Sequence, residues 1–333
     1  MVNQIYIPTA PASEDQNRIA IELQAPLTRR GYAPGLMLVI LGGRKGLQQR
    51  NEQYADLQKF QSVIKDWPLL TMLSCIPLPE LDLLNETEFA VAHIKEGVNY
   101  AAQLPFDTQK TITFHLGSLV TEEEFRSKSQ ESWRNEFHRI IQPRLKDIAT
   151  YGKEHGVTVK VETTPVPEFG DIPDTDQRNY RGVRLNQLRN PFYLTHQWGF
   201  EQIKDSPLSL CLDICHNRTI YEAVQRDEYE GILFPEDIAV FAGSKLLDDV
   251  TKLDSGDLVH LNDGRGLYSQ KAGTVFEEGV TLGEGDIRDL DKIIRILDGK
   301  HVPYVLEINE TDFKNRPNTK KSIDYLLQRG VQK

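Results

Sequence analysis

The sequence predicts a closed (β/α)8 barrel that forms a single domain over residues 1–333. Two observations predict it. First, eight short apolar runs alternate along the chain with longer amphipathic stretches, as strands and helices do in repeated βα units. Second, five of these runs end on an acidic or imidazole side chain, and successive ones lie 47, 51, 47 and 47 residues apart: His115, Glu162, Asp213, His260 and Glu307. Strands that are separated by helices pair in parallel, and eight such units fit a closed barrel.

The expected elements follow in order along the chain. The eight apolar runs predict strands at residues 4–9, 35–43, 69–76, 111–117, 157–164, 208–215, 257–263 and 303–309. The amphipathic stretches predict helices at 51–67, 86–104, 133–156, 285–299 and 319–330. Gly156 and Gly330 stand where a left-handed helix C-cap is expected. An open, doubly wound sheet is the main alternative, but no GxGxxG fingerprint supports it, which favours the barrel.

Two connections are long, at residues 165–207 and 264–284. Both leave from the carboxyl ends of predicted strands, where a barrel enzyme performs its chemistry, so we expect them to be active-site loops. The first loop contains Arg181, Arg184 and Arg189. These side chains either bind an acidic substrate or are solvated loop charges.

Composition narrows the class of protein. The formal net charge is −10, with 49 acidic and 39 basic residues, which argues against a nucleic-acid partner. The N-terminus shows no secretory signal, and no apolar run has the length of a membrane span, so no membrane association is expected. Three cysteines, two of them on a predicted buried strand, suit reduced thiols in a cytoplasmic protein.

The ends of the strands predict a divalent metal site. Parallel strands place their carboxyl ends at the same mouth of the barrel, so Glu162, Asp213 and Glu307 are expected to face one another there. Three buried carboxylates repel one another unless a cation lies between them. Each acid taken alone could instead cap a helix or pair with a base such as Lys160, which strand alternation places on the lumen side together with Glu162.

Three of the eight histidines lie at or just beyond strand ends, beside other polar groups: His115, His216 and His260. His216 follows Asp213 by three residues, on the turn that leaves the strand. We therefore expect it to contact a substrate or a second metal ion.

Six motifs in order, FHLGS, VETT, LDICHNR, HLND, GEGDI and LEIN, resemble the xylose-isomerase-like TIM-barrel superfamily. The resemblance spans roughly residues 111–330, and this group includes sugar isomerases and epimerases, dehydratases and the endonuclease IV enzymes. For the epimerase branch it implies one Mn²⁺, Mg²⁺ or Co²⁺ ion, with Zn²⁺ as an alternative, held by Glu162, Asp213, His260 and Glu307. It also implies that Glu162 and Glu307 exchange a proton through an enediolate.

The resemblance also implies substrate contacts from His216 and Arg265, and we expect His115 and Lys160 to line the same site. The endonuclease IV branch needs three zinc ions and further ligands. His115 and His216 match two of these. However, Ser74 and Cys75 stand where another histidine is expected, and Glu278, Gly279 and Val280 replace an Asp-x-His motif.

The predicted function is therefore metal-dependent isomerisation or epimerisation of a sugar, polyol or keto-acid. An endonuclease IV-like zinc phosphodiesterase on abasic DNA is the runner-up. A dehydratase with the same ligands and a non-catalytic sugar-binding barrel are further alternatives. Members of this group often associate through barrel faces, so a homo-oligomer is also expected.

Overall fold

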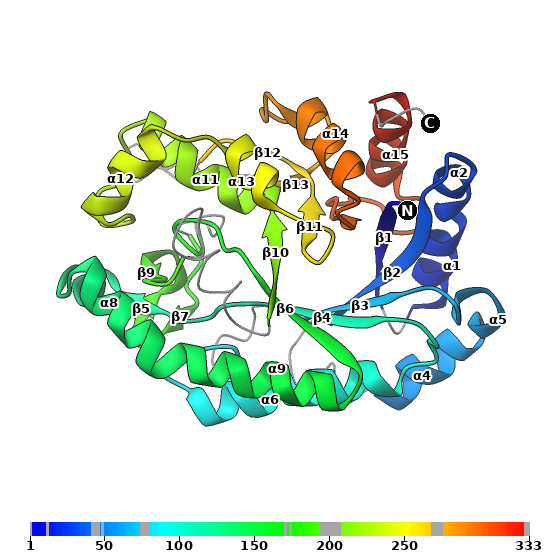
Figure 1. Ribbon diagram of the computed structural model, residues 1–333, viewed down its shortest axis with the longest axis horizontal. Helices are drawn as coiled ribbons and strands as arrows, with labels where there is room; N and C mark the ends of the chain where they lie inside the picture. Colours follow the sequence, from blue (N-terminus) through cyan, green and yellow to red (C-terminus); the bar gives the residue numbers. More distant parts are fainter. Residues whose placement is uncertain are drawn as a thin grey trace.

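Eight parallel strands close into a barrel in the computed structural model (Figure 1). The structure describes residues 2–10, 13–40, 47, 50–73, 80–169, 172, 175–193, 208–267 and 276–329. In order around the wall the strands are β1 (Gln4–Thr9), β2 (Ala33–Ile40), β3 (Leu69–Leu73), β4 (Lys110–His115), β6 (Val157–Glu162), β10 (Ser209–Asp213), β11 (Leu258–Leu261) and β14 (Tyr304–Leu306). β14 pairs with β1 and so completes the wall, which confirms the predicted fold class.

Helices surround this wall, with α6 and α9 along one side and α11 to α15 along the other (Figure 1). On the first half of the chain they are α1 (Glu14–Glu22), α2 (Gln24–Arg29), α4 (Arg50–Gln58), α5 (Gln61–Ile64), α6 (Thr87–Gln103), α7 (Glu122–Arg126), α8 (Gln130–Glu136) and α9 (Gln142–Glu154). On the second half they are α11 (Ile214–Gln225), α12 (Pro235–Ala242), α13 (Leu246–Lys252), α14 (Leu290–Lys300) and α15 (Pro317–Arg329). None of the described helices combines the length and apolar composition that crossing a membrane requires.

Strand alternation divides the apolar side chains into two cores. Val159, Val161, Leu212 and Leu306 face outward and pack in the large core between wall and helices. The inward side chains form a separate cluster that fills the lumen below the mouth: Tyr6, Met37, Leu70, Cys211, Leu258 and Val305. The period of two residues places alternate side chains on opposite faces of a strand, as the sequence predicted.

Several element boundaries differ from the predictions. The run 208–215 is a strand only as far as Asp213, because the Asp213 carboxylate accepts a hydrogen bond from the His216 amide and caps α11. Cys215 therefore lies in a helix and not on the strand. The expected helix 285–299 begins at Leu290, and the stretch 51–67 contains two helices, α4 and α5. The ends of the runs 35–43 and 69–76, and Gly330, lie outside the described residues.

The stretch 133–156, which was predicted to be one helix, changes its helical hydrogen-bond pattern along its length. α8 passes into one π-helical turn, Phe137–Ile141, before α9 continues. α9 ends at Glu154, and Gly156 follows at a φ of 69°, the left-handed conformation that was expected of it.

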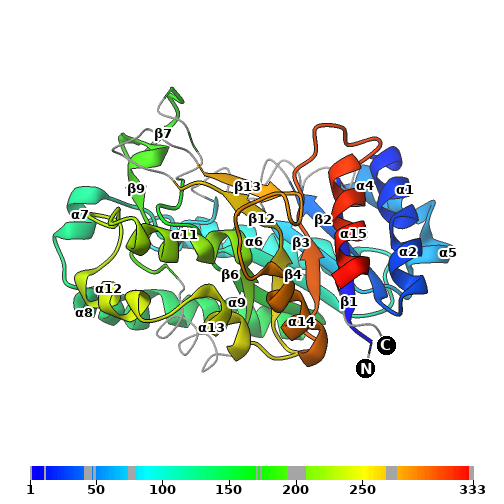
Figure 2. The same ribbon diagram turned by 90° about the horizontal axis from the view of Figure 1, so that it is seen from above.

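Three small antiparallel sheets are added to the barrel: β5 (Val120–Thr121) with β9 (Leu188–Arg189), β7 (Asn179–Tyr180) with β8 (Val183–Arg184), and β12 (Asp263–Arg265) with β13 (Glu277–Val280). β7 and β8 project from the body of the barrel (Figure 2). Two arginines attach this connection to its neighbours: Arg189 is buried and pairs with Glu122 at 3.0 Å, and Arg181 pairs with Glu124 at 2.8 Å. These two arginines are therefore engaged within the protein.

Candidate metal centre and active site

Four ligand-type side chains converge at the mouth of the barrel, each from the end of its own strand: Glu162 from β6, Asp213 from β10, His260 from β11 and Glu307 directly after β14. One donor atom of each lies within 4.8 Å of the others. His260 Nδ1 is 2.9 Å from Glu162 Oε1, 2.7 Å from Glu307 Oε2 and 3.8 Å from Asp213 Oδ2. The structure thus brings together the four residues predicted to bind a metal.

These short distances are not ordinary hydrogen bonds. Both carboxylate oxygens of Glu162, both ring nitrogens of His260 and Oε2 of Glu307 are buried and form no well-aligned hydrogen bond with any residue that the structure describes. Buried polar atoms normally have such partners. Ligands bound to one cation at about 2.1 Å lie about 3 Å from one another with their lone pairs convergent, which matches this arrangement. The donor set fits a divalent ion.

Asp213 is held in place from three directions. Its Oδ2 accepts a hydrogen bond from Asn262 Nδ2 at 3.0 Å, and its Oδ1 accepts one from the His216 amide at 2.8 Å. Its own backbone amide donates to Thr163 Oγ1 at 2.9 Å. Burial raises the pKa of Asp213 to about 7. A nearby divalent ion would counteract this effect, because positive charge favours the ionised carboxylate.

The charges within the ring influence each other. Burial by itself would raise the pKa of Glu162, but His260 and His115 together hold it well below its usual range. Burial would lower the pKa of His260, whereas neighbouring Cys211 and the carboxylates of Glu162 and Glu307 raise it well above its usual value. Glu162 is therefore an ionised carboxylate at neutral pH.

His115 and His216 form a second layer beside this ring, with their imidazoles edge to face at 5.2 Å. His115 Nε2 lies 3.3 Å from Glu162 Oε1, and its Nδ1 lies 3.3 Å from Glu168 Oε1. His216 Nδ1 lies 2.7 Å from the Thr163 carbonyl oxygen, and its Nε2 lies 3.0 Å from Glu278 Oε1. Both histidines therefore lie next to the metal-ligand set, where a substrate would bind.

The sequence prediction missed four supporting residues: Thr163, Glu168, Asn262 and Glu278. Asn262 lies two residues after His260 and Thr163 follows Glu162 directly, so both carry a local signal. Glu168 lies in the connection that follows β6 and Glu278 lies on β13, and they reach histidines that are 53 and 62 residues away. No local pattern predicts such contacts. Burial alone would lower the pKa of His216, but Asp213 and Glu278 raise it well above its usual value.

The structure does not bring Lys160 to the mouth, which corrects the expectation that it contacts the substrate. Its ammonium group donates hydrogen bonds to Ser209 Oγ, at 2.8 Å, and to the Gly256 carbonyl. Ser209 begins β10 and Gly256 precedes β11, so both partners lie at the amino end of the barrel. Alternation determines which face of a strand a side chain occupies, but not the direction in which a long, flexible chain extends along the lumen.

Arg265 lies at the rim and not within the ligand cluster. It is exposed on β12, where its guanidinium donates to the Glu284 carbonyl at 2.9 Å and lies 3.4 Å from the Glu277 carboxylate. The Glu284 side chain, which could have served as the acidic start of the following helix, pairs instead with Lys321 at 3.1 Å. Both Arg265 and Glu284 line a pocket at this rim.

Comparisons with known proteins agree on the fold. No model of a known protein family matches the chain, and no curated protein sequence matches it. Among solved structures, a D-tagatose 3-epimerase-like protein is 15% identical, with a TM-score of 0.55 over 97% of this chain and 96% of that one. A D-allulose 3-epimerase from Methylomonas sp. is 12% identical, with a TM-score of 0.53 over 99% and 98%. A xylose isomerase domain protein from Planctomyces limnophilus is 15% identical, with a TM-score of 0.51 over 98% and 95%.

The chain therefore shares the (β/α)8 barrel fold of these structures over nearly its whole length. These neighbours are sugar isomerases and epimerases by name, at sequence identities that establish the fold alone. The residues that would carry an activity have to be judged from their own geometry.

Proposed function

We propose that this protein is a divalent-metal-dependent isomerase or epimerase of a sugar, polyol or keto-acid, and that it acts in the cytoplasm. One observation carries the proposal: donor atoms of Glu162, Asp213, His260 and Glu307 lie within 4.8 Å of one another at the mouth of the barrel. A divalent ion bound there would polarise a substrate carbonyl or hydroxyl and stabilise negative charge on its oxygen. Two buried free thiols, Cys211 and Cys215, support a reducing compartment.

The protein residues supply the proton transfer. In this proposal the ionised Glu162 removes a proton from the carbon next to the carbonyl, and the C–H electron pair moves to form an enediolate. Glu307, protonated at the start of the step, gives its proton to carbon. Glu162 then releases the proton that it took and Glu307 takes one up from water, so no proton is consumed over the cycle, and the pair exchanges roles in the reverse reaction. His115 and His216 border the ring and hold the carboxylates of Glu168 and Glu278 beside it.

Hydrogen exchange is the direct test. The metal-loaded protein is incubated in D2O with a panel of aldoses, ketoses, keto-derivatives of polyols and keto-acids, and deuterium incorporation next to the carbonyl is followed by NMR. We expect incorporation into one substrate class together with formation of its isomer or epimer. Product that has lost water would assign the chain to the dehydratase alternative. Binding of a sugar with no exchange on any compound would indicate the non-catalytic alternative.

A zinc phosphodiesterase is the second candidate, because the cluster extends beyond four residues. His115, Glu162 and His216 form one further group of convergent donor atoms, and Asp213, His216 and Glu278 form another. Glu278 thus supplies a carboxylate close to the position where the nuclease motif carries its aspartate. Elemental analysis separates the two functions: about one metal ion per chain supports the isomerase, whereas about three zinc ions with cleavage of abasic DNA would support the nuclease.

A further inference from the structure

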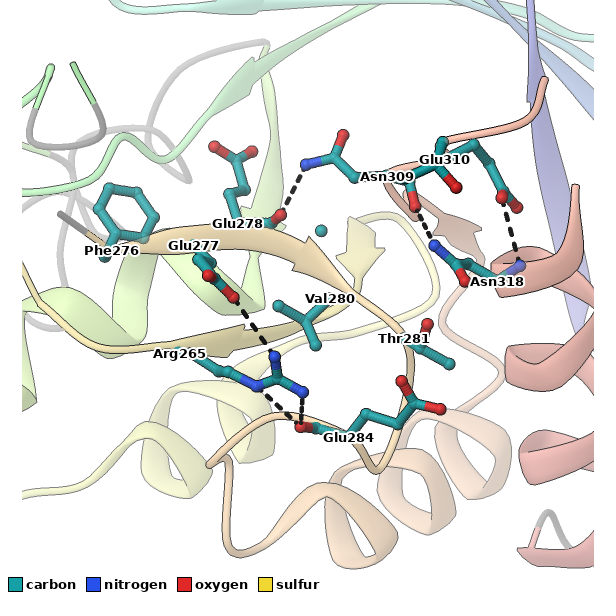
Figure 3. A pocket seen from close by; sticks show the side chains of 12 residues that line it. Arg265, Phe276, Glu277, Glu278, Val280, Thr281, Glu284, Asn309, Glu310 and Asn318 are labelled. Atoms are coloured by element: carbon teal, nitrogen blue, oxygen red, sulfur yellow. Dashed lines mark hydrogen bonds and ion pairs between the residues drawn. The ribbon is translucent and has the colours of Figure 1, made fainter. Parts of the chain in front are cut away.

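A pocket of about 610 Å³ lies at the rim of the mouth, and none of the four ligand residues lines it. One wall is the β12–β13 hairpin, and the other is the segment after β14 together with the start of α15 (Figure 3). Its size is within the usual range for small-molecule sites, about 300–1,000 Å³. The protein therefore has space for a ligand group beyond the part that would lie at the metal centre.

The pocket adjoins the candidate active site through shared residues. Glu278 lines the pocket, and its carboxylate also lies 3.0 Å from His216 Nε2. Asn309 lines the pocket two residues beyond Glu307, and it ties the two walls together: its amide donates to the Gly279 carbonyl at 2.7 Å, and its side chain donates to the Glu278 carbonyl at 2.6 Å (Figure 3). A substrate at the metal centre would thus have this pocket as its neighbour.

The charged groups of the lining are already engaged within the protein. Arg265 is tied to Glu277 and to the Glu284 carbonyl, while the Glu310 carboxylate accepts hydrogen bonds from the Asn318 and Thr319 amides at the start of α15. The lining contains four glutamates and a single arginine. A phosphate or carboxylate would meet net negative charge here and no uncommitted cation among the described lining residues.

The remaining polar groups suit hydroxyl donors. Asn309 and Asn318 each use the side-chain NH2 group to bind a backbone carbonyl, and their side-chain oxygens accept no hydrogen bond from any residue that the structure describes. Thr281 and Thr311 add hydroxyl groups to the lining. Amide oxygens and hydroxyl groups accept and donate the hydrogen bonds that the hydroxyl groups of a sugar ring form.

We propose that this rim pocket is a subsite for a neutral, polyhydroxylated group, such as a second sugar ring joined to the reacting unit. The inference rests on the proposed function, and it restricts the substrate class to glycosides or other extended neutral sugars and excludes sugar phosphates. The Gly279 backbone, at a φ of 68° and packed against Asn309, holds the hairpin wall in place.

The test is direct binding to the metal-loaded full-length chain, measured by calorimetry. The probes are glucose and fructose, the disaccharides cellobiose, maltose and sucrose, and glucose 6-phosphate. We expect at least one disaccharide to bind about tenfold more tightly than its component monosaccharides, equal to about 1.4 kcal/mol. Glucose 6-phosphate is expected to bind no better than glucose. Equal affinity for every disaccharide and monosaccharide, or preference for the phosphate, would overturn the proposal.

Substitutions of lining residues test whether the preference for the disaccharide arises in this pocket. Thr311→Val and Asn318→Ala should each abolish the preference for the disaccharide, whereas Asn315→Ala, on the same segment outside the pocket lining, should retain it. Thr311 is exposed, so its replacement leaves the fold intact even if Asn318→Ala weakens α15. A preference that survives in both pocket variants would contradict the subsite. Binding does not require turnover, so an unaltered protein that prefers the disaccharide but exchanges hydrogen on no substrate would show that the catalytic proposal fails while the subsite stands.

Discussion

The lumen of the barrel holds two layers of different chemistry, and the four strands that carry the upper layer also contribute side chains to the lower one. On each of these four strands, two side chains that are two residues apart point into the lumen. The pairs, with the residue of the lower layer given first, are Lys160 and Glu162, Cys211 and Asp213, Leu258 and His260, and Val305 and Glu307. The lower layer is mainly apolar and closed, while the upper layer is charged and forms the candidate metal centre. An apolar floor removes water from beneath the carboxylates, which strengthens every electrostatic interaction above it.

This contrast shows why the upper layer needs a cation. Three carboxylates on a dry floor are costly to bury unless positive charge or hydrogen bonds compensate them. His260 and the hydrogen bonds to Asp213 compensate in part.

The largest effect is expected from the two glutamates of the upper layer. Glu162→Gln and Glu307→Gln should each lower turnover by at least about 100-fold, because an amide cannot accept and return the proton. Circular dichroism should show an intact fold. Initial rates of hydrogen exchange on the identified substrate provide the measurement. Either variant with full activity would show that the acid/base assignment is wrong.

Metal binding should stabilise the upper layer. Mn²⁺ at 1,000 times its dissociation constant should add about 4 kcal/mol to the free energy of unfolding, provided that it binds only the folded chain. The measurement is the shift in unfolding temperature between Mn²⁺ and EDTA. Asp213→Asn should reduce this shift, whereas Met37→Leu in the lower layer should preserve it. If Mn²⁺ did not change the unfolding temperature of the unaltered protein, the proposed metal site would be contradicted.

A buried acid outside the lumen shows what burial does without a metal site. Asp249 on α13 accepts hydrogen bonds from Tyr221 at 2.6 Å and Asn217 at 3.1 Å, and burial raises its pKa from 3.8 to about 7. The folded state therefore favours the protonated acid, so this group makes stability fall as pH rises from about 4 to 7. At about 1.4 kcal/mol per pH unit, the loss amounts to about 4 kcal/mol.

Asp249→Asn should remove this dependence. The difference in unfolding free energy between the variant and the unaltered protein should grow in favour of the variant from pH 4 to pH 7 and then remain constant. Denaturant unfolding at several pH values measures it, and titration of other groups cancels in the difference. A difference that does not vary with pH would show that Asp249 titrates normally.

Adjacent glutamates on β13 allow a matched comparison at the edge of the upper layer. Glu278 contacts His216, whereas Glu277 pairs with the exposed Arg265. Glu278→Gln removes the charge that orients the imidazole and should lower turnover about tenfold, with the Mn²⁺ stabilisation unchanged. Glu277→Gln should change turnover by less than about twofold. Equal effects of the two substitutions would exclude a specific role for the contact with His216.

The smallest effect on activity is expected in the lower layer. Lys160→Met should leave the KM and turnover within about twofold, because its ammonium group lies at the amino end of the barrel. It should lower the free energy of unfolding by about 1–3 kcal/mol, because the Gly256 carbonyl loses a buried donor. Steady-state kinetics and denaturant unfolding measure the two effects. A raised KM would show that Lys160 does contribute to substrate binding.

Local patterns in the sequence predicted much of the fold. Strands β1, β4 and β6 lie within about two residues of their predicted limits, because a period of two in apolar side chains is a property of the strand itself. The end of β10 was placed wrongly because an aspartate that caps a helix has the same local appearance as one that continues a strand. The winding change between α8 and α9 left no sign in the apolar periodicity.

The sequence by itself determined the barrel and which four strand ends carry Glu162, Asp213, His260 and Glu307. Both follow from repeats along the chain, and parallel strands bring their carboxyl ends to one mouth. Only the tertiary structure decided that Lys160 extends away from that mouth, and that Glu168 from a turn and Glu278 from β13 reach the histidines. It also decided that a rim pocket lies beside Glu278. These contacts join residues that are far apart in the chain, and their energies depend on burial and distance, which a local pattern does not contain.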